Sequence, residues 1–175
     1  DLVSAGTSST INGTLSNTSA SLIEVQSSDR CCFGPIDGTL TVANGFINNG
    51  TIKLQNFTTR GSGLGTSTLN VTSGTLTNAG SGLIWATGDS DLAALNAQLT
   101  NNGTIQADRG LTITNTARTF DTSAGTLNLA TGQTLTVAGG TTKIGGSTTI
   151  TGSGARTLSL TGADMLDVVN DWTLP

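Results

Sequence analysis

Few residues in this chain have types suited to catalysis. The sequence has no His and no Tyr, and its 11 acidic residues include one glutamate, Glu24. The only close acid pairs are Asp89 with Asp91 and Asp164 with Asp167. Paired carboxylates suit a calcium site or the general acid and base of glycoside hydrolysis, but solvated loop positions are the simpler interpretation. We therefore expect no catalytic residue, no cofactor-binding residue and no metal site, and we predict that the protein is not an enzyme.

The two cysteines, Cys31 and Cys32, are adjacent in the sequence. Neighbouring cysteines cannot link distant parts of a chain, and a disulfide between them is a strained ring. One interpretation is a loop pair that is free or locally bridged. The other is an intermolecular disulfide to a second subunit, which an oxidising compartment permits.

The charge pattern excludes several classes of partner. The net charge is −4, and the seven basic residues are scattered singly rather than gathered into a stripe. Binding to nucleic acid or to anionic membrane surfaces needs such a stripe, and no apolar run is long enough to span a bilayer. Ser and Thr take the place of Lys and Glu as the main polar residues, which favours an extracellular, secreted or cell-surface location.

The elements that would position any functional residue are short strands. The clearest unit is residues 99–113, in which an alternating run, an Asn-Asn-Gly turn, a second run, an Asp-Arg-Gly corner and a third run follow one another. Successive side chains of a strand point to opposite faces. One set of apolar residues can therefore face inward together, namely Leu99, Ile105, Ala107, Leu111 and Ile113.

Looser copies of this unit recur along the chain. Counted from Ile11, Ile47, Leu76, Leu99 and Leu127, their spacing is irregular, and two polar excursions at residues 27–37 and 58–67 interrupt them. A solenoid tolerates corner insertions because an inserted loop protrudes without altering the stack. The pattern predicts one all-β domain over residues 1–175, a parallel β-solenoid of about six to seven short-stranded coils with corner loop insertions.

Two stretches carry a resemblance to a known group. Residues 47–54 and 99–107 resemble repeats of bacterial β-helical surface proteins, the filamentous-haemagglutinin-like and autotransporter-passenger group. The resemblance implies a right-handed parallel β-helix that is secreted and either adhesive or structural. Members of that group are typically far longer, so we expect either an excised piece or a compact subunit that gains length by assembling.

The ends of the chain bear on assembly. Residues 1–9 form an N-terminal edge without an amphipathic helix, and residues 163–175 form a C-terminal cap or edge, as either a short helix or a last strand. Uncovered strand ladders pair with other chains, and a heterologous contact that does not close gives an open fibre. We predict a structural protein that stacks head to tail with itself, with candidate assembly residues Leu2, Val3, Met165, Leu166, Val168, Val169 and Trp172.

Three alternatives remain at the level of sequence. An adhesin segment would bind cell-surface glycans through the two excursions. An ice-binding solenoid would need pairs such as Thr39/Thr41 and Thr112/Thr114 in register on one flat face, which the irregular spacing does not ensure. A polysaccharide-processing β-helix needs clustered acids and bases that the chain lacks.

Two local features were also open to interpretation. Residues 89–95 suit either one helical turn or a corner. Six Asn residues lie in glycosylation sequons, and we expect two of them, Asn49 and Asn102, to serve as corner residues; the set is Asn12, Asn17, Asn49, Asn56, Asn70 and Asn102.

Overall fold

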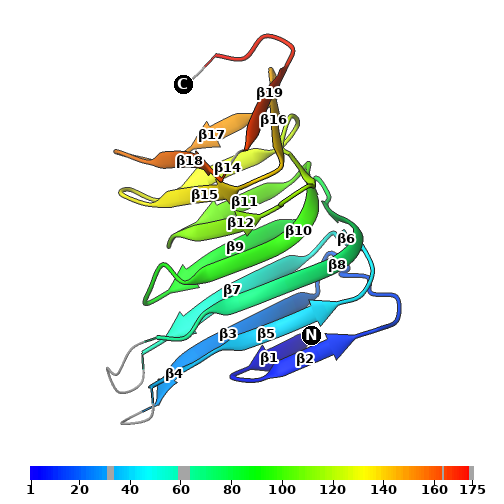
Figure 1. The fold of residues 1–175 in the computed structure, drawn as a ribbon, viewed down its shortest axis with the longest axis vertical. Helices are drawn as coiled ribbons and strands as arrows, with labels where there is room; N and C mark the ends of the chain where they lie inside the picture. The colour runs from blue at the N-terminus through cyan, green and yellow to red at the C-terminus, as the bar shows by residue number, and fades with distance from the viewer. Residues whose placement is uncertain (31–33, 59–63, 163, 174–175) are drawn as a thin grey trace.

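The computed structural model describes residues 1–30, 34–58, 64–162 and 164–173. Within these residues the chain forms strands and turns and no helix. The strands stack along the long axis of the molecule, from the N-terminus at one end to the C-terminus at the other (Figure 1). Every pairing between named strands is parallel except one hairpin, so the architecture is that of a β-solenoid or β-helix.

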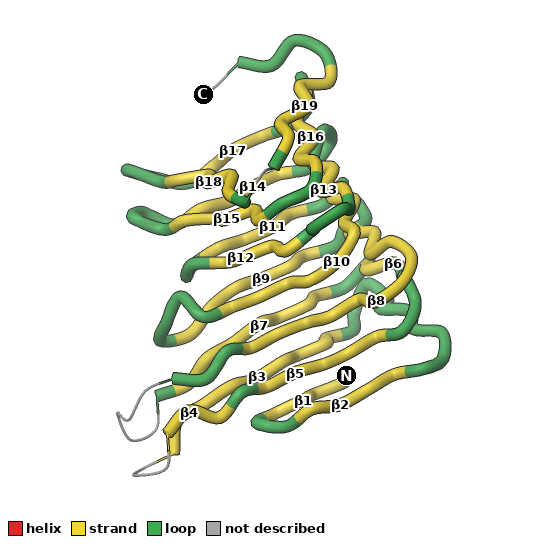
Figure 2. Tube along the Cα trace, viewed as in Figure 1, coloured by secondary structure: helices red, strands yellow, loops and turns green. Residues whose placement is uncertain are grey.

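The strands belong to two sheets, here called sheet A and sheet B, which the chain visits in alternation (Figure 2). Sheet A contains β4 (Gly34–Ile36), which pairs with β3, and a path of seven further strands in stacking order. These are β1 (Leu2–Ala5), β3 (Leu22–Arg30), β7 (Thr51–Phe57), β9 (Leu83–Gly88), β11 (Thr104–Ala107), β14 (Thr126–Leu129) and β17 (Thr149–Thr151).

Sheet B is wider and bends around the core. Its long strands β8 and β10 run through the bend, whereas in later layers the same path is divided between two shorter strands. The strands are β2 (Ser8–Ile11), β5 (Gly38–Val42), β6 (Ile47–Asn48), β8 (Ser67–Asn78), β10 (Ala93–Asn101), β12 (Leu111–Thr114), β13 (Thr119–Asp121), β15 (Thr134–Ala138), β16 (Thr141–Gly145), β18 (Thr157–Thr161) and β19 (Met165–Val169).

The core consists of apolar columns that run through the stack. Alternation sends every second side chain inward, and parallel pairing places equivalent residues of neighbouring layers on top of one another. Few aromatic residues are needed because branched aliphatic side chains fill such columns. In sheet A the first column is Leu2, Ile23, Ile52, Ile84, Ile105, Leu127 and Ile150.

The inward set predicted for residues 99–113 is confirmed. Leu99, Ile105, Ala107 and Ile113 are fully buried, and Leu111 is 1% exposed. The alternation was sufficient for this prediction because each of these runs buries only one face.

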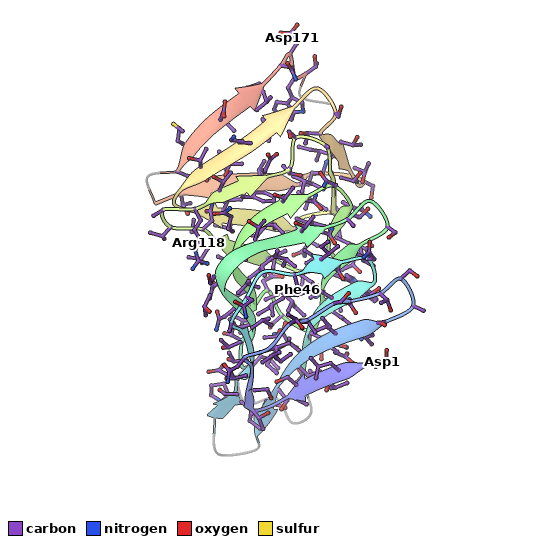
Figure 3. The ribbon with its side chains drawn as sticks, turned by 90° about the vertical axis from the view of Figure 1, so that its right-hand side faces the viewer. Asp1, Phe46, Arg118 and Asp171 are labelled. Carbon is purple, nitrogen blue, oxygen red and sulfur yellow. The ribbon has the colours of Figure 1, made fainter. Side chains whose placement is uncertain are left out.

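The predicted phase of one repeat is wrong. The sequence predicts Ile47 as the apolar start of its unit, but Ile47 is 53% exposed, whereas Phe46 is 5% exposed and belongs to the core inside the stack of strands (Figure 3). The register aligns Ile47 with Thr77 and Asn48 with Asn78. The burial of Asn48 fixes the phase, because alternation then sends Ile47 outward and Phe46 inward.

Three local expectations are also resolved. Residues 89–92 form a corner rather than a helical turn, and β19 makes the tail a last strand rather than a helix. The excursion at residues 27–37 is only partly a loop, because β3 continues to Arg30 and pairs antiparallel with β4. β3 pairs with β7 as far as Ser28 and with β4 from Ser28 to Arg30.

Candidate functional site: the two ends of the stack

The C-terminal end of the stack exposes apolar side chains. On β19 the exposed fractions are 59% for Met165, 47% for Leu166, 48% for Val168 and 36% for Val169. β17 and β19 are the outermost strands of their sheet paths, and β18 ends the remaining branch of sheet B. Their outer edges therefore present backbone N–H and C=O groups that can pair with a further strand.

An open cavity of about 570 Å³ lies at this end of the core. Its lining is mainly aliphatic and includes Trp172 of the C-terminal tail. Arg156 is the one charged residue of the lining, and its Nη1 donates hydrogen bonds to the carbonyl oxygens of Gly152 and Gly154. The cavity is the unfilled upper end of the apolar columns, lined by Leu129, Ile144, Ile150, Leu158, Leu160 and Leu166 among others.

The N-terminal end has a comparable arrangement. β1 is the outermost strand of sheet A, and β2 pairs only with β5. Leu2 aligns with Ile23 and packs against the core, while Val3 points to the outer face and is 54% exposed. Ile11 and Leu15 are also partly buried residues that pack against the core. Of the predicted assembly residues, Leu2, Leu166 and Val168 continue inward columns, whereas Val3, Met165 and Val169 do not. The seventh, Trp172, lines the cavity.

A buried asparagine ladder runs along the corner of the solenoid. The side-chain Nδ2 of Asn17 donates to Oδ1 of Asn48 at 2.6 Å, Asn48 to Asn78 at 2.7 Å, and Asn78 to Asn101 at 2.8 Å. Asn101 in turn donates to Oγ1 of Thr122 at 3.1 Å. The four Asn side chains are at most 2% exposed. Each layer therefore satisfies the buried amide of the next.

Each ladder amide also bonds to the backbone at the corner of the following layer. Asn48 Nδ2 donates to the carbonyl oxygen of Leu83, and Asn78 Nδ2 to that of Thr104. A Cβ on Gly103 would collide with the backbone carbonyl oxygen of Ala79 in the layer below. The Asn-Asn-Gly motif is thus a buried ladder residue, a surface residue and a close-packed glycine.

The ladder was missed at the level of sequence. Asparagine is rarely buried, so the sequence predicts only the surface residues Asn49 and Asn102 as corner residues, and both do occupy the corner. A signal was present, because the alternation of each unit continues into an Asn two positions after an apolar residue: Leu15 and Asn17, Phe46 and Asn48, Leu76 and Asn78, Leu99 and Asn101.

The glycosylation sequons differ in whether their Asn side chain is buried. Asn17 and Asn56 are 2% and 0% exposed, and both donate hydrogen bonds inside the protein. Asn12 and Asn102 are exposed and lie outside the strands. An attached glycan is compatible with the fold at the second pair and not at the first.

Carboxylates of the two acid pairs accept hydrogen bonds from other layers of the solenoid. Asp89 Oδ2 accepts from the Thr58 backbone N–H and Asp91 Oδ1 from that of Gly110, each at 2.7 Å. Asp164 Oδ2 accepts from Thr142 Oγ1 at 2.7 Å. Among the residues that the structure describes, no group of three His, Cys, Asp or Glu side chains is placed to hold a metal ion.

Some predicted sites cannot be placed. Cys31 and Cys32, with the middle of the second excursion at residues 59–63, lie outside the described residues. Within the described part of the chain no helix is long and apolar enough to cross a membrane.

The outer face of sheet B carries two columns of small polar residues in register. Alignment across seven strands gives one column of Ser8, Thr39, Thr68, Ala94, Thr112, Thr136 and Ser159. The second column is Thr10, Thr41, Asn70, Asn96, Thr114, Ala138 and Thr161. The insertions that make the sequence spacing irregular leave this face intact because they lie at corners.

Comparison with protein-family models, with curated proteins and with solved structures found no match to this chain.

Proposed function

We propose that this protein is a non-enzymatic structural subunit that stacks head to tail into an extracellular fibre. The proposed subunit is a right-handed β-helix of about six to seven coils. One observation carries the proposal: the apolar columns of the core reach both ends, with an open cavity of about 570 Å³ at one of them. A second copy placed on β17 would set its Leu2 above Ile150 and continue the same column.

The contact would bury apolar surface and pair strand edges together. Burial of apolar surface stabilises by about 25 cal/mol per Å², and the unpaired backbone groups of β17 and β18 would gain partners in β1 and β2, respectively. Because the two contacting surfaces differ, the interface is heterologous and repeats without closing. The proposed extracellular location is supported by the scarcity of charged residues, which are 10% of the chain.

Assembly is tested with purified protein by sedimentation and electron microscopy over a range of concentrations. We expect filaments that grow with concentration, and loss of filaments in Leu2→Lys and in Leu166→Lys. Val3→Lys and Met165→Lys are matched controls, because these residues are at the same ends but outside the columns, and they should still assemble. Circular dichroism confirms that each variant is folded.

A mixing experiment tests the direction of stacking. Leu2→Lys protein retains an intact C-terminal end, so it should add to a growing end, block further addition and shorten wild-type filaments at substoichiometric amounts. The double variant Leu2→Lys, Leu166→Lys should have no such effect. A wild-type protein that stays monomeric at high concentration, or end variants that assemble like the controls, would refute the proposal.

The in-register face of sheet B supports a second candidate, ice binding. Its hydroxyl and amide groups form a grid with a spacing of about 4.8 Å between strands and about 6.6 Å along them, and the two columns contain no charged residue. Such a grid can order water in two dimensions.

This second candidate has a direct test. Wild-type protein should slow ice recrystallisation and produce thermal hysteresis, and Thr112→Lys should abolish both effects. Thr104→Lys, on the outer face of sheet A, is the matched control and should keep them. Absence of both effects in the wild-type protein excludes ice binding.

A further inference from the structure

The outer face of sheet A gathers residue types that are scarce elsewhere in the chain. Trp85 of β9 is aligned with Lys53 of β7 and Gln106 of β11, and Lys53 is aligned with Glu24 of β3. The chain contains two Trp, two Lys and one Glu, and one Trp, one Lys and the Glu meet here. The outward columns of sheet B consist of small, uncharged residues, so the two outer faces of the solenoid differ in chemistry.

The side chains of this group form one connected network. Lys53 Nζ lies 2.9 Å from Glu24 Oε1 and 5.6 Å from the centroid of the Trp85 ring. The Trp85 Nε1 donates to Asp108 Oδ2 at 2.8 Å. Gln106 Nε2 donates to both carboxylate oxygens of Asp108, at 3.0 and 3.1 Å. The network extends over four neighbouring strands, about 14 Å at the usual strand spacing.

The network holds the indole in one orientation while leaving it partly accessible. The Lys53 ammonium on one side and the hydrogen-bonded Asp108 carboxylate just beyond the end of β11 both restrain the ring. The Lys53 side chain is 22% exposed, and Trp85, Gln106 and Asp108 are half-buried. The entropic cost of ordering these side chains when a ligand packs here would therefore be small.

We propose that this network, Glu24, Lys53, Trp85, Gln106 and Asp108, is a binding site for a neutral saccharide chain. The apolar C–H face of a sugar ring would pack on the accessible part of the indole. Sugar hydroxyls both donate and accept, and the surrounding ammonium, amide and carboxylate groups offer both capacities. A partly accessible aromatic ring with polar groups around it matches a ligand that is apolar on its faces and polar at its edge.

The charges of the site select against acidic saccharides. Two carboxylates and one ammonium give the network a net negative charge, and the whole chain carries −4. Sulfated or carboxylated glycans would meet this charge unfavourably. The site therefore fits a neutral chain that crosses the strands, along the axis in which the network extends.

The site lies on a sheet face rather than at an end of the stack. Binding there is independent of the head-to-tail contact, and a stacked fibre would repeat the site once in every subunit. The saccharide site goes beyond the proposed structural function, and either can fail without the other.

Fluorescence of a single tryptophan gives a direct test. In the Trp172→Phe variant Trp85 is the remaining tryptophan, so its emission reports on packing at the site. Cellohexaose, mannohexaose and hexa-N-acetylchitohexaose are the neutral probes, and a heparin-derived hexasaccharide is the acidic probe. We expect at least one neutral probe to shift or quench the emission in a saturable manner and the heparin fragment to leave it unchanged.

Variants then assign the binding, measured by calorimetry in the otherwise wild-type chain. Trp85→Ala should weaken binding by about tenfold or more, and Trp85→Phe, which keeps an aromatic ring, should weaken it less. Phe57→Ala is the matched control, because Phe57 is an outward aromatic of the same sheet about 13 Å along the strand from Lys53, and it should bind normally. Thermal melting checks that each variant folds.

Three results would overturn the proposal. They are no response to any neutral probe at millimolar concentration, equal binding by Trp85→Phe, Trp85→Ala and wild-type protein, or tighter binding of the heparin fragment than of the neutral chains.

Discussion

At the scale of single residues, the buried amides determine how the layers align. A branched aliphatic column permits small slips between layers, because its contacts are not directional. A buried amide does not permit such slips, because its partner must lie at hydrogen-bonding distance. The ladder from Asn17 to Asn101 therefore fixes the position of the corner in each layer, and with it the inward phase of the neighbouring apolar residues.

Removal of a central ladder amide should be costly. Asn78→Ala deprives Asn48 of an acceptor, Asn101 of a donor and the Thr104 carbonyl of its side-chain donor. Buried polar groups left without partners should lower the free energy of unfolding by about 2–3 kcal/mol. Asn102→Ala, at the exposed position beside the ladder, should change it by about 0.5 kcal/mol or less. Urea denaturation of both variants measures the difference, and equal stability would contradict the structural role of the ladder.

At the scale of elements, the sequence predicted strand content and facing well but missed one phase. Alternation identified the inward residues of 99–113 because these strands have one polar and one apolar face. It failed at Phe46-Ile47, where two large apolar residues are adjacent and period two alone cannot choose between them. The choice is made by Asn48, whose partners lie in other layers and are distant in sequence.

A pair of substitutions tests the corrected phase. Phe46→Ala should lower the free energy of unfolding by about 3–5 kcal/mol, because it empties a buried position. Ile47→Ala, at a residue that is 53% exposed, should cost well under about 1.5 kcal/mol. Chemical denaturation distinguishes the two, and the reverse order would restore the phase that the sequence suggested.

The outer faces could be predicted only in part. Pairs such as Thr39 and Thr41 were visible as outward residues, but their alignment with Thr68 and Thr112 depends on where the intervening loops leave the stack. Likewise, Glu24, Lys53 and Trp85 are far apart in sequence, and nothing local indicates that parallel pairing brings them together. The two ends were predictable as edges, whereas the cavity at the C-terminal end follows from the packing of several layers.

At the scale of the whole molecule, stability is expected to vary along the axis. Inner strands such as β9 pair on both sides, whereas β1 and β19 pair on one. In stacked repeats each layer is stabilised mainly by its neighbours, so local opening should start at the ends.

Hydrogen exchange measured by mass spectrometry checks this gradient. In dilute protein, amides of β7, β9 and β11 should exchange slowest and those of β1 and β19 fastest. At concentrations where filaments form, β1, β17 and β19 should gain protection while β9 changes little. Uniform exchange in dilute protein would contradict the layered description of stability.

The asparagine ladder also gives the molecule a polarity. Every link has the same sense, with the Nδ2 of one layer donating to the Oδ1 of the layer that follows it in the chain. By the same geometry the Oδ1 of Asn17, whose side chain is 2% exposed, faces away from Asn48. A second copy stacked head to tail would keep the sense of every link, whereas a copy turned end for end would reverse it. The ladder thus gives the solenoid a direction that only head-to-tail stacking preserves from one subunit to the next.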